Sequence, residues 1–406
     1  MTLLDRLGEV KEQQRSSSLQ EEAWQQFLKC GLPTKKHEQY RYLKLRDLYE
    51  RPYSLNSIET PPFSKIESHI LPECKERCLV FINGSFCREY STSEGIDVQS
   101  LQEGYQTYGS FLQSQGRQEI KKERDPFLLL SGALNRDGIF LYISPNQTIE
   151  SPIQILHFSD GSGLSFPCIH LFAGKQARAT VVTTQAGENR GLINQSEHLY
   201  LEEGADISLI QSAPNHSSSG WLFEGLRAQL KKESRLNVIS ASNGAKTVRY
   251  DYKVALNGEN ASASLQGAWI LTEQREAHVN VLIEHNAPET HSNQLFKGIL
   301  YDHSRSSFEG KLLVDSIAQK TEAYQLNNNL LLSDHALAYS KPNLEIFADD
   351  VKASHGATVG QLDADGLFYL RSRGVTEKEA ATLLTQGFYQ EVTNQIPIES
   401  LRRQWQ

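Results

Sequence analysis

Residues Leu199–Gln211 read LYLEEGADISLIQ, and residues Ala228–Ser240 read AQLKKESRLNVIS. Each segment has an apolar strand, a charged turn and a second strand in which apolar and polar residues alternate. Such alternation is typical of a β-strand with one buried face. Similar units recur at intervals of roughly 20 to 30 residues, which is the range of solenoid repeats. The pattern favours a mainly β chain built as a β-solenoid, with a β-sandwich as the alternative.

The rest of the chain flanks this strand-rich region. The first 50 residues and the residues after Gly360 have apolar side chains at helical spacing. We expect a mainly helical unit over residues 1–125 with a short hairpin at Asn83-Gly84, a β core over 126–358, and a helical unit over 359–406. Because a stacked solenoid needs a cover at each end, we expect the flanking units to supply the two covers.

The C-terminal unit carries helix-boundary signals. Asp363 is placed to cap the start of one helix, and Gly374 to end it. Thr376 and Glu379 match a capping box, in which each side chain satisfies a free backbone donor near the other. These signals predict a helical hairpin beside the β core.

Composition and charge narrow the classes of function. The chain has 406 residues and a net charge of -8, so it has no basic footprint for nucleic acid. No apolar run is long enough to span a bilayer, and the first residues lack the apolar region of a secretory signal. The five cysteines are odd in number and irregular in spacing, which indicates reduced thiols in a cytoplasmic protein. Three of them, Cys74, Cys78 and Cys87, lack a second matching pair and are interpreted as small buried residues rather than zinc ligands.

Motifs of self-sufficient enzymes are missing from the sequence. It contains no G-x-x-x-x-G-K-[ST] phosphate loop, no G-x-S-x-G elbow, no H-E-x-x-H and no dinucleotide fingerprint. We therefore expect a protein without an enzymatic activity of its own.

One histidine stands out, because His355 lies in a run of small residues where strand-like sequence gives way to helix-like sequence. Small neighbours let another backbone or a bulky inorganic group approach, and Gly356 permits an unusual φ. Local sequence leaves both a structural histidine and a ligand open.

The C-terminal third resembles a known family. The residues that carry the resemblance are NNNLLLS at 327–333, SKPNLEI at 340–346, ADDVK at 348–352, SHGATVGQLD at 354–363 and LFYLRSRG at 367–374. Together they are similar to the signature of the SufB/SufD family, the subunits of the SUF iron–sulfur cluster assembly machine. Within that family, the absence of any cysteine after Cys168 favours the SufD branch.

The resemblance implies a right-handed parallel β-helix flanked by helical units, and a non-catalytic scaffold subunit in the cytoplasm. It implies pairing with a SufB-like subunit through the β-helix and docking of a SufC-like ABC ATPase by the C-terminal helices. A transient iron–sulfur cluster would be shared with the SufB-like subunit, and the resemblance leaves open a flavin in the complex and a homodimer of the chain alone. The residues expected to contact the ATPase are Leu367, Phe368, Arg371, Arg373, Leu384 and Phe388.

His355 matches the family histidine that holds the nascent cluster at the subunit interface. Many relatives have a cysteine just before this Ser-His pair, where this chain has Ala353. A second histidine, His335, follows a similar Ser-Asp pair 20 residues earlier. If one coil takes about that many residues, the two histidines lie on adjacent rungs, about 4.8 Å apart. We therefore hypothesise that His335 is an auxiliary iron contact, the alternative being a polar surface rung.

Two other classes of function stay open at this point. One is a β-solenoid carbohydrate-active enzyme, and the other is a purely structural scaffold in which His355 serves only a subunit contact.

Overall fold

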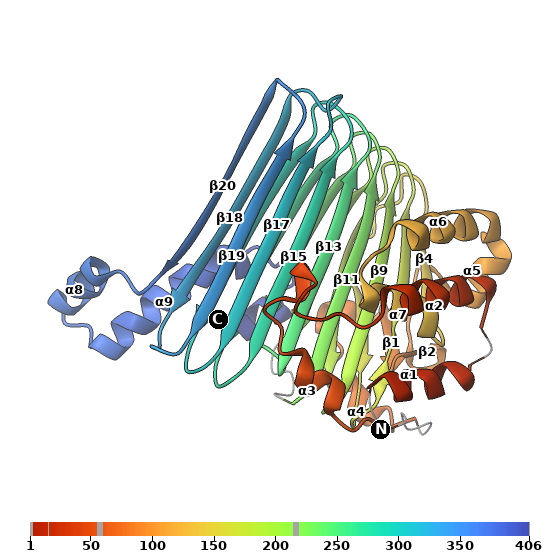
Figure 1. Ribbon diagram of the computed structural model, residues 1–406, viewed down its shortest axis with the longest axis horizontal. Helices are drawn as coiled ribbons and strands as arrows, with labels where there is room; N and C mark the ends of the chain where they lie inside the picture. The colour runs from red at the N-terminus through yellow and green to blue at the C-terminus, as the bar shows by residue number, and fades with distance from the viewer. Residues whose placement is uncertain (1–2, 15, 55–59, 214–218, 406) are drawn as a thin grey trace.

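The computed structural model describes residues 3–14, 16–54, 60–213 and 219–405, and its body is a solenoid of two facing sheets (Figure 1). Successive strands alternate between the sheets, and neighbours within each sheet are parallel over the whole central region. The predicted parallel β-helix is confirmed, and the sandwich alternative is wrong. In the order of pairing, sheet A contains β2 (Ser85–Cys87), β1 (Cys78–Ile82), β5 (Ile153–Phe158), β8 (Arg178–Ala186), β10 (Asp206–Ala213), β12 (Arg235–Ser242), β14 (Ser262–Leu271), β16 (His291–Leu300), β18 (Thr321–Leu331) and β20 (Val351–Gly360).

Sheet B runs in the same direction along the solenoid. It contains β3 (Asp97–Ser100), β4 (Ile139–Ile143), β7 (Cys168–Ala173), β9 (Leu192–Leu201), β11 (Trp221–Leu230), β13 (Thr247–Leu256), β15 (Glu276–His285), β17 (Arg305–Val314) and β19 (Leu337–Ile346), while β6 (Leu164–Ser165) also pairs with β9.

The length of one rung follows from the register between strands of one sheet. Asp206 pairs with Arg235, and Gln325 pairs with His355, so these rungs take 29 and 30 residues. The expected repeat interval of roughly 20 to 30 residues is right only at its upper limit.

The N-terminal end of the solenoid is closed by antiparallel strands. The Asn83-Gly84 turn, with both φ angles positive, folds β2 back onto β1 and confirms the predicted hairpin. In the other sheet, β3 runs antiparallel to β4. Helices then cover the outer face of sheet B, where Asn194 of β9 donates to the carbonyl of Phe127 in α7. The helices of this unit are α1 (Leu3–Glu12), α2 (Ser18–Cys30), α3 (Leu45–Glu50), α4 (Ser64–Glu67), α5 (Leu101–Thr107), α6 (Gly109–Lys122) and α7 (Pro126–Leu134), with short 3-10 turns at Glu38–Tyr40, Pro72–Cys74 and Arg88–Tyr90.

The C-terminal helices are α8 (Ala364–Ser372), α9 (Glu377–Thr393) and α10 (Glu399–Arg402), followed by a 3-10 turn at Arg403–Trp405. Asp363 caps α8, Gly374 follows it with φ 86°, and Thr376 and Glu379 form the predicted capping box of α9.

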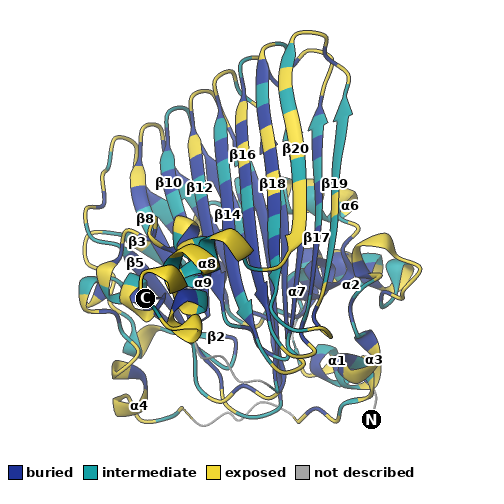
Figure 2. Cartoon of the chain, turned by 90° about the vertical axis from the view of Figure 1, so that its left-hand side faces the viewer, coloured by how far each residue is buried: buried dark blue, intermediate teal, exposed yellow. Residues whose placement is uncertain are grey.

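These helices do not cover the end of the solenoid. The last turns of α9 pack Tyr389 and Val392 against the outer face of sheet A, beside Ile239 and Ile299 (Figure 2). The expectation of a cover at each end is therefore wrong at the C-terminal end. The physical reason is that the outer face of sheet A is itself apolar here and needs burial. No described helix is long and apolar enough to cross a membrane.

Candidate functional site

The open end of the solenoid consists of the last strand of each sheet, β19 and β20. Within the described residues, no strand pairs with the outer edge of either one. Most of β20 is exposed, whereas β18 beside it alternates between buried and exposed residues (Figure 2). An unprotected edge presents a row of backbone donors and acceptors that can pair with another chain.

His355 lies in the middle of this exposed edge strand. It is in register with Gln325, and paired residues of parallel strands point to the same face. The Gln325 side chain is buried between the sheets, where its amide donates to Gln294 at 3.0 Å. His355 therefore faces the open mouth of the space between the sheets, above a layer of amides to which Asn327 and Asn329 also belong.

The small residues around His355 act through space rather than through backbone freedom. Gly356 is not among the glycines with positive φ, so the expected unusual φ is wrong. A Cβ at Gly356 would instead lie 3.1 Å from a methyl of Leu326 on the neighbouring strand. A side chain at this position would have to push Leu326 aside, so the absence of one lets the edge stay flat.

His335 is not the rung neighbour of His355. It lies in the turn between β18 and β19, where its ring stacks on His303 with centroids 4.6 Å apart. The end of β20 that is nearest this turn is five residues beyond His355, or roughly 16 Å along the strand. The adjacency argument is wrong because a rung takes about 30 residues rather than 20. An iron contact by His335 stays a prediction without that support.

Large exposed apolar side chains gather at the C-terminal end of the molecule. Half of those on the described surface lie on the last two rungs, which is unusual for a surface left in water. We call them the end patch: Ile317, Tyr324, Leu326, Leu337, Phe347 and Val359.

Three further exposed apolar residues lie on the α8–α9 hairpin, namely Phe368, Tyr369 and Leu383. Of the six predicted ATPase contacts, three are exposed: Phe368, Arg371 and Arg373. Leu367 and Leu384 are half-buried. Phe388 packs under the ammonium of Lys297 at 4.6 Å and so contributes to attachment of the hairpin to sheet A.

A second cluster of reactive side chains lies far from the open end in the chain. Cys168 and His170 of β7 and His198 of β9 bring one ligand atom each to within 4.8 Å of one another. Sequence analysis missed this cluster. Its only local signal is the Cys-x-His alternation, which places both side chains on one face of a strand.

The other cysteines behave as predicted where they are buried. Burial raises the pKa of Cys74 and of Cys78 to about 12, so both stay neutral thiols. Cys87 is only half-buried.

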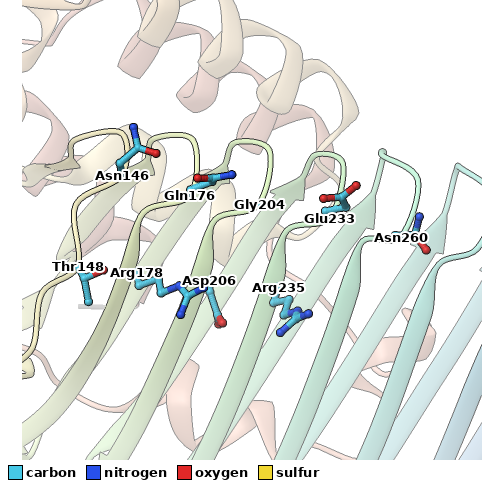
Figure 3. Close-up of a pocket in the computed structure, with 9 residues that line it drawn as sticks. All are labelled: Asn146, Thr148, Gln176, Arg178, Gly204, Asp206, Glu233, Arg235 and Asn260. Atoms are coloured by element: carbon cyan, nitrogen blue, oxygen red, sulfur yellow. The ribbon is translucent and has the colours of Figure 1, made fainter.

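A shallow groove of about 600 Å³ runs along the turns that lead into the strands of sheet A (Figure 3). Figure 3 shows Arg178, Asp206 and Arg235 on successive rungs, below the turn residues. No cysteine or histidine lines it, and charges of opposite sign alternate along it. The groove is a solvated edge of the solenoid, and we assign it no chemistry.

Comparison with known proteins places the chain. A family model described as the SUF system FeS cluster assembly, SufBD core domain, matches residues 157–388, and the SufBD N-terminal region matches residues 9–155. The chain belongs to the SufBD family. The predicted resemblance is thereby confirmed.

Curated relatives agree along most of the chain. The iron–sulfur cluster assembly protein SufD of Escherichia coli is 29% identical over 98% of this chain and 93% of its own length. A SufBD family protein of Synechocystis is 29% identical over 91% and 85%, and SufD of Bacillus subtilis is 25% identical over 70% and 66%. Family membership supports a role in the SUF system and argues against a carbohydrate-active solenoid.

Proposed function

We propose that this chain is the SufD-type scaffold subunit of a SUF iron–sulfur assembly complex, and that it pairs with a SufB-like subunit through the edges of β19 and β20. The observation that carries the proposal is the bare edge of β20, which holds His355 at the mouth of the solenoid. Addition of a strand from a partner would satisfy the edge amides and carbonyls, and the end patch would supply apolar contacts around them.

In this proposal, His355 offers an imidazole to an iron–sulfur cluster that is cargo of the complex. Ala353 lies on the same face and adds no thiolate, so the sulfur ligands come from the partner. A neutral imidazole in place of a thiolate removes negative charge and raises the reduction potential of a cluster. Ligation also requires the deprotonated ring, so cluster binding weakens in acid. One imidazole from this chain suits a cluster that must later be handed on.

The test is anaerobic cluster reconstitution on the co-expressed complex, with His355→Ala compared with wild type. Loss of the sulfur-to-iron charge-transfer absorption with the subunits still associated is the expected result. Full absorption in the variant would refute ligation and favour a purely structural scaffold. His335→Ala is the matched control, since His335 is an equally exposed histidine near the same end. Unchanged cluster yield and lifetime in that variant would end the auxiliary-contact hypothesis.

The α8–α9 hairpin is proposed to dock the SufC-like ATPase. Phe368 is 73% exposed and Leu383 is 50% exposed, and basic residues lie beside them. Deletion of residues 361–406 is a poor test, because it would uncover the apolar face of sheet A that α9 and Trp405 bury. Point variants are cleaner. We expect Leu383→Ala to weaken co-purification of the ATPase, whereas Leu28→Ala on α2, 52% exposed, leaves it intact. Equal binding by both variants would refute docking at the hairpin.

A further inference from the structure

The cluster of Cys168, His170 and His198 lies on the outer face of sheet B, away from the space between the sheets. Ile169 and Leu171 of the same strand point into the core, so the residues that alternate with them point outward. The helices α5 and α6 cover this face, and Cys168 packs with Leu101 and Leu112 from them.

The positions of the two imidazoles are fixed by strand register. His170 pairs with His198 across β7 and β9, and their rings stack with centroids 4.5 Å apart and planes 9° apart. Cys168 is two residues before His170 and therefore lies on the same face. The fold thus brings a sulfur and two ring nitrogens together from rigid strands.

A carboxylate from α6 fixes one of the rings. Glu119 lies 2.7 Å from Nδ1 of His198, and the hydroxyl of Tyr200 donates to its other oxygen at 2.9 Å. When Nδ1 carries the proton that Glu119 accepts, Nε2 is left with the lone pair that can bind a metal. Carboxylate, histidine and metal in this order are the usual arrangement around zinc-binding histidines.

The cluster also has an unmet need for a partner. Nδ1 of His170 is buried, its residue is only 7% exposed, and it has no hydrogen-bond partner among the described residues. Buried polar atoms are normally satisfied, and a metal ion would satisfy a ring nitrogen of this kind. His198 keeps 15% of its side chain exposed, which leaves an approach from solvent.

The charges in the cluster suit a divalent cation. Burial alone would raise the pKa of Cys168, but the neighbouring His170 and His198 lower it to about 5, so the sulfur is a thiolate. One thiolate and the Glu119 carboxylate balance a doubly charged ion when both imidazoles are neutral. Zinc and iron(II) both accept thiolate and imidazole together.

We propose that Cys168, His170 and His198 bind one divalent transition-metal ion of the zinc or iron(II) type, with Glu119 as a positioning residue behind His198. Three protein ligands leave a fourth coordination position for water or an incoming ligand. This site is independent of His355, which lies on the last strand of the other sheet.

The test uses the full chain and two metals. Elemental analysis of protein purified without oxygen should find about one zinc or iron per chain, and the element found distinguishes the two sources. Reconstitution with Co²⁺ alone should give a sulfur-to-cobalt charge-transfer absorption. Cys168→Ala should remove that absorption and lower bound metal at least tenfold.

Matched variants separate a metal site from general damage. Cys78→Ala removes another buried cysteine that no histidine contacts, and His355→Ala removes the proposed cluster ligand; both should keep the full cobalt signal. Glu119→Gln should keep the absorption but weaken cobalt affinity by about 10- to 100-fold. Wild-type protein that takes up no stoichiometric metal, or an unchanged cobalt spectrum in Cys168→Ala, would overturn the proposal.

Discussion

The two ends of the solenoid solve the same problem in opposite ways. At the N-terminal end, β2 and β3 run antiparallel to their neighbours and stop the stack, and Phe81 is fully buried there against Phe86. At the C-terminal end, two strands of ten residues each stop with bare edges, and exposed apolar side chains surround them. Because unprotected edges promote association, natural proteins usually block them. The contrast indicates that one end provides stability and the other is kept for a partner.

The closed end should carry the largest stability effect. Phe81→Ala removes an aromatic ring from a fully buried site, which should lower the free energy of unfolding by about 3–5 kcal/mol. Phe347→Ala at the open end removes a ring that is 66% exposed and should change it by less than about 0.5 kcal/mol. Chemical denaturation of both variants measures the difference. Equal losses would mean that the two ends do not divide the work in this way.

The open end should carry the association effect. Phe347→Glu places a charge in the end patch and should weaken binding to the SufB-like subunit by about 2 kcal/mol, or roughly 30-fold. Leu28→Glu, at a comparably exposed position on α2, should leave the affinity unchanged. Titration calorimetry or co-purification reports both. Wild-type affinity in Phe347→Glu would remove the end patch from the interface.

A smaller effect concerns the space between the sheets, which also differs along its length. Amides occupy it near the open end, whereas carboxylates occupy it further back. Glu197 accepts from Gln211 at 2.7 Å, and Glu224 accepts from Gln185 at 3.3 Å, in both cases across the two sheets. Burial, and for Glu224 also the charge of Glu197, raises the pKa to about 7 for Glu197 and about 8 for Glu224.

This difference predicts a pH dependence. A carboxyl whose pKa is raised by folding is protonated in the folded chain and ionised in the unfolded chain between about 4.5 and about 8, so stability falls as the pH rises through that window. Glu224→Gln cannot ionise. Its melting temperature should therefore fall less than that of wild type between pH 5 and pH 8, as scanning calorimetry would record. Parallel curves would show that Glu224 is not buried as a neutral acid.

Much of the fold follows from local sequence. Strand alternation predicts the solenoid, Asn83-Gly84 predicts the hairpin, and Thr376 with Glu379 predicts the start of α9, because each of these signals lies within a few residues. The rung length and the placement of the C-terminal helices do not follow in the same way. They depend on which strand pairs with which, and on the apolar outer face of sheet A.

The candidate sites divide along the same line. His355 was identified through a family motif that is contiguous in sequence, and the register with Gln325 then gave its position. The cluster at Cys168 was missed because His198 is reached only through the pairing of β7 with β9, and Glu119 only through the crossing of α6. Pairings between distant segments leave no local pattern.

The claim that the bare edge receives a partner strand is tested most directly by amide hydrogen exchange. Exchange in β20 and β19 should be compared between the isolated chain and its complex with the SufB-like subunit. We predict that amides within Val351–Gly360 and Leu337–Ile346 become protected in the complex, while those of β1 and β3 do not change. An intact complex in which β20 exchanges as fast as in the isolated chain would contradict the account.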